Sequence, residues 1–388
     1  MKINNNITAY RFQGYTDAWE LRKLNNIADV RDGTHNSPRY IEFGYPLVTS
    51  KNIKNGQVNF EDIQYISSFD YEEINKRSKV NINDILMGMI GTVGNLALVR
   101  EEPKFAIKNV ALIKNIGAVN VGFLYHYLGS YVIERQLQNS LDGGTQKFIS
   151  LNKIRHLDIT FPSLPEQEAI GTFFSTLDQQ ITLHQRKLDT LKEQKKTYLK
   201  LLFPAKGQTK PSLRFQGFED DWEEVKLGEL CDIRTGKLDA NAMVENGEYD
   251  FYTSGIKKYR IDVAEFEGPA ITIAGNGATV GYMHLADGKF NAYQRTYVLT
   301  NFKVDRRYIF SEIAKKLPIK IQQEARTGNI PYIVLSMLTE LSISLPTLPE
   351  QEAIGTFFQT IDQEIAQVED KLASLKEMKK TLLRKLFV

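Results

Sequence analysis

The sequence predicts an α+β protein: two mixed α/β domains joined by a long antiparallel two-helix coiled coil, with a pseudo-two-fold internal repeat. Three observations carry this prediction. A repeat divides the 388 residues into two halves, a heptad pattern runs through the closely copied part of each half, and short strand-like runs fill the rest.

The repeat is plain when the chain is aligned with itself. Residues 162–203 and 346–387 align without gaps at an offset of 184, and 27 of the 42 positions are identical. A second echo opens each half, with RFQGYTDAWE from Arg11 and RFQGFEDDWE from Arg214. Between these echoes the halves match poorly, so the order is A–B–A′–B′, with B copied closely and A diverged.

This order predicts five segments. The stretch Pro204–Pro211 has Pro, Gly and Lys and no apolar periodicity, which is typical of a domain boundary. We expect a first domain, a first long helix, a linker, a second domain and a second long helix at residues 1–161, 162–203, 204–213, 214–345 and 346–388.

Each B segment is predicted to be a long helix. Ser163 with Glu166, and Thr347 with Glu350, fit the capping box that opens a helix. Apolar residues then recur in alternating steps of three and four over four to five heptads, which favours a coiled coil. The predicted seam is Ile170, Phe174, Leu177, Ile181, Leu188, Leu191, Ile354, Phe358, Ile361, Ile365, Val368, Leu372 and Leu375.

Two such stripes are buried most simply against each other. Two equivalent halves usually pack by a two-fold relation, and that relation makes the helices antiparallel. Roughly 37 helical residues would span about 55 Å. His184, Lys195 and Lys379 interrupt the seam: they either set the register or contact a partner, or, as we expect, they are tolerated there, with the lysines extending to solvent at a frayed end.

The A segments are predicted to mix strands with one helix each. Strand-like runs include Tyr45–Thr49, Leu96–Val99, Ala270–Ala274, Tyr282–Leu285 and Thr296–Leu299. One helix per domain is expected near Phe123–Gln138 and Tyr308–Gln323.

Composition and missing motifs exclude several classes of function. No P-loop and no HExxH motif occurs, and Cys231 is the only cysteine, so we expect no ATP hydrolysis, no metal site and no disulfide framework. No apolar run is long enough for a membrane span, and a reducing cytoplasm is the expected compartment. A net charge of only +2 indicates that any DNA binding depends on local basic patches or on partners.

Two motifs imitate catalytic loops. Gly275–Gly281 has the wrong spacing for a dinucleotide fingerprint and lies between two strand-like runs, so a hairpin turn is the better interpretation. Asn329–Tyr332 is similar to the Asn-Pro-Pro-Tyr loop of amino-group DNA methyltransferases, but Ile330 replaces one proline. We interpret it as a structural turn.

Taken together, the chain resembles the specificity subunits of type I restriction-modification systems. The resemblance covers nearly the whole chain. It is carried by the paired LPEQEAIGTFF segments (Leu164–Phe174 and Leu348–Phe358), the Trp19 and Trp222 openings, the run Tyr45-Pro-Leu-Val with Asn52-Ile, and Gly277-Ala-Thr-Val-Gly281. Each motif alone is weak, whereas their two-fold arrangement is specific.

The resemblance implies two target-recognition domains, each reading one half of a bipartite, asymmetric site in double-stranded DNA. It implies that the coiled coil sets the gap and docks two modification (methyltransferase) subunits, and that restriction (translocase and endonuclease) subunits join them. The chain itself would be non-catalytic and hold no cofactor; S-adenosylmethionine, ATP and Mg²⁺ would be held by partner subunits.

Candidate DNA contacts are polar loop residues, because Arg, Lys, Asn and Gln are the usual readers of base edges. In the first domain they are Thr34, His35, Asn36, Ser37, Arg39, Lys51, Asn52, Lys108, Asn109, Gln146 and Lys147. In the second they are Ser254, Lys257, Lys258, Tyr259, Arg260, Asn276, Gln294, Arg295, Arg326 and Asn329.

Two other classes of function stay open at this point. A coiled-coil scaffold that binds only proteins explains the helices but not the duplicated Trp-led domains. A self-sufficient nuclease or methyltransferase is disfavoured by the missing motifs.

Overall fold

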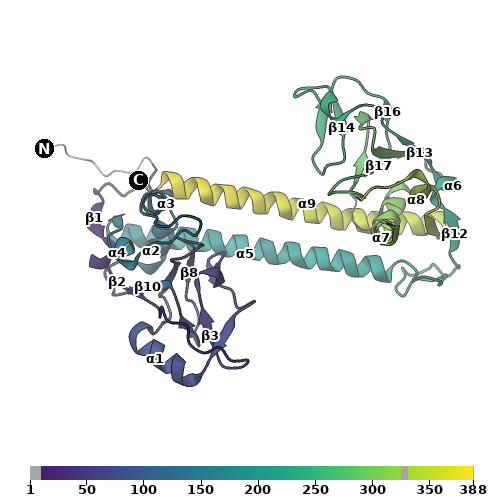
Figure 1. Ribbon diagram of the computed structural model, residues 1–388. Coiled ribbons are helices and arrows are strands. Elements are labelled where there is room, and N and C mark those ends of the chain that lie inside the picture. The colour runs from purple at the N-terminus through teal and green to yellow at the C-terminus, as the bar shows by residue number, and fades with distance from the viewer. Residues whose placement is uncertain (1–9, 325–330, 388) are drawn as a thin grey trace. The chain divides into compact units, whose positions relative to one another are not determined.

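The computed structural model describes residues 10–324 and 331–387 (Figure 1). The chain forms two compact units: unit 1 comprises Met1–His184 with Lys371–Val388, and unit 2 comprises Gln185–Asp370. Each unit therefore contains one mixed α/β domain, one end of the first long helix and the opposite end of the second.

The two long helices are α5 (Leu164–Leu201) and α9 (Leu348–Lys385). In unit 1, Ile170 near the start of α5 shares a core with Leu386 just after α9. In unit 2, Leu202 just after α5 shares a core with Ile354 near the start of α9. The predicted antiparallel pairing is therefore confirmed within each unit.

Two ion pairs join the helices. Lys379 of α9 donates to Asp178 of α5 in unit 1, and Lys195 of α5 donates to Asp362 of α9 in unit 2. The two pairs are equivalent by the 184-residue repeat. Our expectation that both lysines extend freely to solvent is therefore wrong, because each has an aspartate of the facing helix within reach.

The capping-box glutamates also differ from expectation. Both carboxylate oxygens of Glu166 accept hydrogen bonds from the Arg11 guanidinium at 2.7 Å, and Glu350 accepts from Arg214 in the same way. The two glutamate side chains are 0% and 1% exposed. Instead of closing the helix start locally, each glutamate anchors the segment that opens its domain.

The domain of unit 1 contains two sheets, of strand order β2-β10-β7-β8 and β6-β3-β9, and the pairs β1-β11 and β4-β5. Its strands are β1 (Glu20–Lys23), β2 (Ala28–Asp32), β3 (Tyr45–Val48), β4 (Ile53–Lys54), β5 (Gln57–Val58), β6 (Gln64–Ile66), β7 (Ile85–Gly88), β8 (Leu96–Leu98), β9 (Ala106–Ile107), β10 (Val110–Asn115) and β11 (Asp158–Phe161). Its helices are α1 (Ser68–Ser78), α2 (Val121–Leu128), α3 (Tyr131–Gln138) and α4 (Leu151–Arg155).

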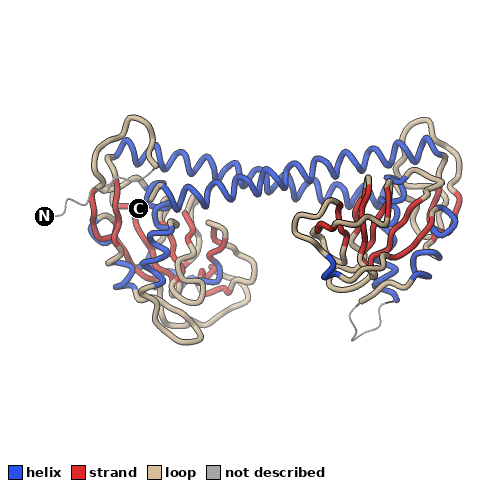
Figure 2. Tube along the Cα trace, turned by 90° about the horizontal axis from the view of Figure 1, so that it is seen from above, coloured by secondary structure: helices blue, strands red, loops and turns tan. Residues whose placement is uncertain are grey.

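The domain of unit 2 repeats this plan, with sheets of order β13-β20-β17-β18 and β15-β14-β19-β16 and the pair β12-β21. Its strands are β12 (Glu223–Lys226), β13 (Asp232–Thr235), β14 (Tyr249–Tyr252), β15 (Tyr259–Ile261), β16 (Phe266–Glu267), β17 (Ala270–Ala274), β18 (Met283–Ala286), β19 (Lys289–Ala292), β20 (Thr296–Thr300) and β21 (Ser342–Leu345). Its helices are α6 (Leu227–Leu230), α7 (Arg306–Glu324) and α8 (Leu335–Thr339). In each unit the strands gather apart from the long helices (Figure 2).

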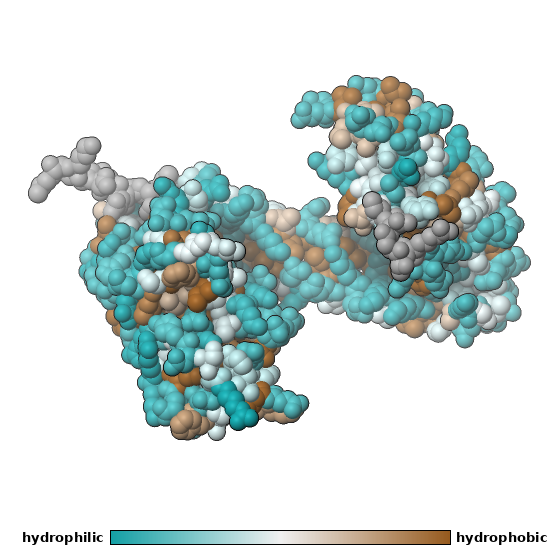
Figure 3. Space-filling model, in the orientation of Figure 1, coloured by the Kyte–Doolittle hydropathy of each residue, from teal (hydrophilic) through white to brown (hydrophobic). Residues whose placement is uncertain are grey.

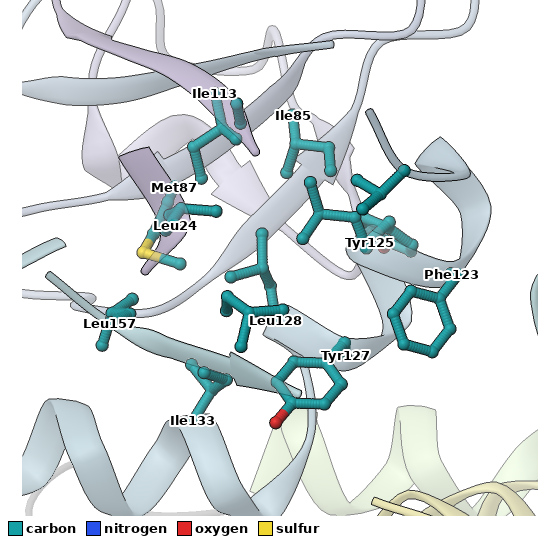
Figure 4. Close-up of a cluster of buried hydrophobic side chains, with 14 of the residues drawn as sticks. Leu24, Ile85, Met87, Ile113, Phe123, Tyr125, Tyr127, Leu128, Ile133 and Leu157 are labelled. Atoms are coloured by element: carbon teal, nitrogen blue, oxygen red, sulfur yellow. The ribbon is translucent and has the colours of Figure 1, made fainter. Parts of the chain in front are cut away.

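Each domain is rooted on the long helices by the same aromatic cluster. In unit 1, Trp19, Phe123 of α2 and Phe387 lie with ring centroids 5.9–6.3 Å apart. In unit 2, Trp222, Tyr308 of α7 and Phe203 lie 5.5–6.1 Å apart. Figure 4 shows how the α2 side chains of unit 1, including Phe123, Tyr125 and Tyr127, point into the core with side chains such as Ile85 and Ile113 of the larger sheet.

All five strand-like runs match strands to within a residue or two at each end. The expected helix of the first domain is broken into α2 and α3 at Gly129–Ser130. The expectation of one main helix is wrong there, because α1 also forms, opened by Ser67, whose Oγ accepts from the Asp70 N–H.

Candidate nucleic-acid interface

Four strands of the first domain end close together. Strand β10 pairs antiparallel with both β2 and β7, so those two strands end at the edge where β10 begins. Strands β3 and β9 run parallel to each other, with the Lys108 N–H donating to Val48 O at 2.9 Å, and they end beside β2, because the Thr34 N–H donates to Ile107 O at 3.0 Å. The loops that follow these strands therefore leave from one end of the domain.

Ser50, the second residue after β3, ties these loops together. Its Oγ donates to Asn109 O at 2.9 Å and accepts from the N–H groups of Met89 and Ile90 at 2.9 and 3.2 Å. The Thr92 hydroxyl donates to Ser50 O at 2.7 Å. The turns at 50–52, 89–92 and 108–109 thus form one network around a side chain that is buried.

The loop after β2 joins the same network. Lys108 Nζ donates to Ser37 Oγ, and His35 Nδ1 lies 2.8 Å from Asn109 Oδ1. The loop that contains Lys147 closes the other side, because Lys147 O accepts from the Gly91 N–H at 2.9 Å. The structure therefore brings candidates from all four predicted loop segments to one end of the domain.

The second domain has the same construction. Thr279 Oγ1 donates to Ser254 O, as Thr92 does to Ser50 O, and Ser254 Oγ donates to Asn276 Oδ1 at 2.6 Å. Gly275 N–H donates to Arg295 O at 2.8 Å, which attaches the turn after β19. Ser254, Asn276, Gln294 and Arg295 therefore gather at the end of the domain equivalent to the first cluster.

Three of the four residues at the centre of these networks were not predicted from the sequence. Ser50, Thr92 and Thr279 are not among the candidates, whereas Ser254 is. A signal was present: Thr-Ser stands at 49–50 and again at 253–254, and Thr-Val-Gly stands at 92–94 and again at 279–281. Short identities of this kind survive in diverged domains where a side chain holds several loops in place.

Most candidates present exposed or half-buried side chains at this end of each domain. Arg39, Asn36 and Gln146 are exposed and have no side-chain hydrogen bond or ion pair within residues 10–324 and 331–387. The other candidates with exposed or half-buried side chains are Thr34, His35, Ser37, Lys51, Lys108, Asn109, Lys147, Ser254, Lys257, Lys258, Tyr259, Asn276, Gln294 and Arg295.

Two candidates have structural roles instead. Asn52 is 2% exposed, and its amide accepts from the Thr49 N–H and donates to Asn59 O, so its side chain holds the turn in place. The Arg260 guanidinium is held by Gly247 O, Glu248 O and Asp250 within its own hairpin, which leaves it little freedom to reach a ligand. Arg326 and Asn329 lie outside the described residues.

The electrostatics of these ends are mixed. The first domain has cationic side chains at Arg39, Lys51, Lys108 and Lys147. Among the described residues these four form one ion pair, between Lys51 Nζ and Asp62 Oδ2 at 3.2 Å, and both of its side chains are exposed. Such a pair contributes little and can be exchanged for a phosphate. In the face seen in Figure 3, both units are mainly hydrophilic, with apolar side chains in small scattered groups.

Burial suppresses titration beside the second cluster. It raises the pKa of Tyr252 to about 12 and lowers the pKa of His284 below its usual value. The two rings lie 5.2 Å apart at the base of the hairpin that carries Lys257 and Lys258. Both side chains are therefore neutral near pH 7, so the positive charge of this hairpin comes from Lys257, Lys258 and Arg260.

The glycine-rich segment of the second domain is a hairpin turn, as predicted. It joins β17 to β18, with the Ala274 N–H donating to Tyr282 O and the Gly281 N–H to Ala274 O, both at 2.8 Å. No helix follows it, so it lacks the setting of a phosphate-binding loop. Across the described residues no group of three or more His, Cys, Asp or Glu side chains could hold a metal ion, and no described helix could cross a membrane.

Comparison with known proteins gives the same architecture. The family model "Type I restriction modification DNA specificity domain" matches residues 16–193 and 219–377. The chain is 37% identical over 164 residues to the EcoDI type I restriction enzyme specificity subunit of Escherichia coli, a match covering 42% of this chain and 36% of that protein. It is 24% identical over 406 residues to the putative type I restriction enzyme MjaX specificity subunit of Methanocaldococcus jannaschii, covering 94% and 92% of the two chains.

Solved structures agree on the fold. The type I restriction-modification S subunit of Mycoplasma genitalium superposes with a TM-score of 0.74 at 18% identity and 97% coverage of both chains. A chain from a structural study of complex assembly and conformational transition of the type I restriction-modification system gives 0.51 at 17% identity, covering 96% of this chain and 98% of that one.

The two-fold match of the family model covers most of the chain. The protein therefore belongs to the type I restriction-modification DNA specificity family, and the scaffold alternative is not favoured.

Proposed function

We propose that this chain is the sequence-reading subunit of a type I restriction-modification complex, in which each domain reads one half of a bipartite DNA target. The loop ends described above are the reading surfaces. The length of α5 and α9 fixes the number of unread base pairs between the two half-sites.

One observation carries this proposal: the two loop ends share a scaffold but not their exposed side chains. The residue after the serine that holds the loops, Ser50 or Ser254, is Lys51 in the first domain and Gly255 in the second. The residue after the parallel strand is Lys108 in one and Tyr293 in the other. A shared frame with different residues at its surface suits two readers of different sequences, and hence an asymmetric target.

The chain acts without catalysis in this proposal. Methyl transfer and DNA cleavage belong to two modification subunits and to restriction subunits, which hold S-adenosylmethionine, ATP and Mg²⁺. The near-neutral charge supports this division of labour, because a protein that holds DNA alone by releasing counterions is usually more basic. Modification subunits that close around the duplex would add the missing phosphate contacts.

Methylome sequencing tests the proposal in a host that carries this gene and its partner subunits. Deleting the gene is expected to abolish methylation of one bipartite motif, and restoring it to bring that motif back. Exchanging residues 1–161 for the first domain of another family member is expected to change one half-site and leave the gap and the other half unchanged.

The matched exchange of residues 214–345 is expected to change only the other half-site. A motif that survives deletion of the gene would contradict the function. A single-domain exchange that alters both halves would contradict the assignment of one half to each domain.

A further inference from the structure

The two domains carry a carboxamide side chain at the same place in the fold. Asn109 is the second residue after the parallel strand β9, and Gln294 is the second residue after the parallel strand β19. The Asn109 N–H donates to Thr34 O at 3.1 Å, and the Gln294 N–H donates to Leu238 O at 2.8 Å. Both residues thus sit between the same two loops.

The surrounding backbone confirms this equivalence. The preceding residues, Lys108 and Tyr293, each donate an N–H to the last residue of the neighbouring parallel strand at 2.9 Å. Facing them, Gly33 and Gly236 pack so closely that an added Cβ would lie 2.2 Å and 1.8 Å from a carbonyl oxygen of β9 and β19. The carboxamide turn is therefore held at a fixed height in both domains.

Several contacts fix both the backbone and the side chain of Asn109, although the residue lies at the surface. Its backbone is left-handed (φ 53°), a conformation that asparagine tolerates better than most residues, and its carbonyl accepts from the buried Ser50 hydroxyl. Its Oδ1 lies 2.8 Å from His35 Nδ1. The amide Nδ2 has no hydrogen-bond partner among residues 10–324 and 331–387, and the side chain is half-buried.

The imidazole that touches Asn109 is itself fixed. His35 Nε2 lies 2.8 Å from Asp32 Oδ2, and Asp32, which is 4% exposed, also accepts from Arg77 of α1. This series of contacts runs from Arg77 of α1 through the buried Asp32 carboxylate and the His35 ring to the Asn109 carboxamide. Such support is what positions a recognition group within a fraction of an ångström.

Gln294 has a simpler version of the same arrangement. Its Nε2 donates to Asp239 Oδ2 at 3.4 Å, and Asp239 is fixed because it caps the turn at Ala240–Ala242. The side chain is exposed. In both domains a carboxylate orients the carboxamide, directly in one and through an imidazole in the other.

A carboxamide offers one donor and one acceptor side by side, which matches the N7 acceptor and N6 amino donor of adenine in the major groove. In either direction of the His35 contact, the Asn109 carboxamide keeps one N–H and one oxygen lone pair, so both contacts to adenine are available. We propose that Asn109 and Gln294 are the equivalent base-reading residues of the two domains, each recognising an adenine in its own half-site. This inference rests on the proposed function.

The test is the methylated motif written by the complex containing Asn109→Asp or Gln294→Glu. A carboxylate cannot donate to N7 but accepts from the amino group of cytosine. Each variant is expected to lose about five- to 150-fold discrimination for adenine at one position of one half-site. The loss falls in opposite halves for the two variants. The readout is methyl transfer by the complex to duplexes that vary one base pair at a time.

Asn83→Asp is the matched control. Asn83 is also an asparagine with a left-handed backbone (φ 68°), but it precedes β7, at the opposite end of the same sheet. Its variant is expected to leave the motif unchanged. His35→Ala is expected to relax the same base position as Asn109→Asp, to a smaller extent, because His35 positions the amide and does not itself read the base.

The outcomes separate this inference from the function beneath it. If the wild-type complex writes no bipartite motif, the proposed function fails. If wild type writes one and the Asn109 and Gln294 variants lower the methylation rate equally at every base, the function stands and the inference is overturned. Gln294→Glu changes an exposed side chain, so its result decides the matter even if Asn109→Asp folds poorly.

Discussion

Removing the arginine that opens the first domain is expected to destabilise unit 1 selectively. Arg11→Ala leaves the Glu166 carboxylate without its two hydrogen bonds in a site where the side chain is 0% exposed. Breaking a buried pair on one side typically costs about 3–5 kcal/mol, because the remaining charge stays desolvated. With a urea slope of about 2 kcal/mol per molar, the unfolding midpoint falls by roughly 1.5–2.5 M.

The chain provides its own reporter for this measurement. Its two tryptophans, Trp19 and Trp222, are each 4% exposed and lie in different units. In a Trp222→Phe background, fluorescence follows unit 1 alone, and in a Trp19→Phe background it follows unit 2. Arg11→Ala should therefore shift the first signal much more than the second, and Arg214→Ala should do the reverse.

Two controls define the cause. Arg22→Ala removes an exposed pair with Glu20 and is expected to cost at most about 1 kcal/mol. The double variant Arg11→Met with Glu166→Leu removes both charges and should recover most of the loss. A cost below about 1 kcal/mol for Arg11→Ala, or a double variant no better than the single one, would refute the reasoning.

Three further outcomes are expected. Burial lowers the pKa of His126 to about 3, so the folded state binds fewer protons than the unfolded state. The free energy of unfolding should therefore fall by about 1.4 kcal/mol for each pH unit below about pH 6.5. His126→Asn should flatten that dependence, as measured by urea titrations at several pH values. Lys195→Asp should cost about 1 kcal/mol in unit 2, and adding Asp362→Lys should restore it, as read by Trp222 fluorescence. Inserting seven residues in register into both α5 and α9 should lengthen the methylated motif's gap by about three base pairs with both half-sites unchanged; altered half-sites with an unchanged gap would show that the helices read sequence.

The parts predictable from sequence are those governed by periodicity and by repetition. The heptad seam needs only apolar spacing, and the poor match between the A segments still left the Trp19 and Trp222 openings recognisable. The antiparallel direction followed from symmetry. These features depend on many residues at once, so single exceptions do not obscure them.

Contacts between distant segments could not be predicted in this way. Nothing local pairs Arg11 with Glu166 across 155 positions, and the capping-box pattern suggested a different partner for the glutamate. Likewise, Asn52 looks like a polar loop residue, but the three-residue turn at Ser50–Asn52 encloses its amide. Loop side chains acquire their roles from the fold, so the sequence could name candidate loop residues but could not separate those that point outward from those that support the loops.

The contacts that attach each domain to the long helices are the same in both units, and this has a consequence for how the protein can evolve. In both units an arginine pairs with a glutamate and a tryptophan ring packs against a phenylalanine, whatever the loops above them contain. The carbonyl of the proline before each long helix, Pro162 or Pro346, also accepts from a glutamine of that helix. A domain from another lineage that retains these attachment residues would pack against the same helix ends without disturbing the other unit. One recombination event that replaces a single domain can therefore change one half of the recognised sequence, while the rest of the protein is inherited intact.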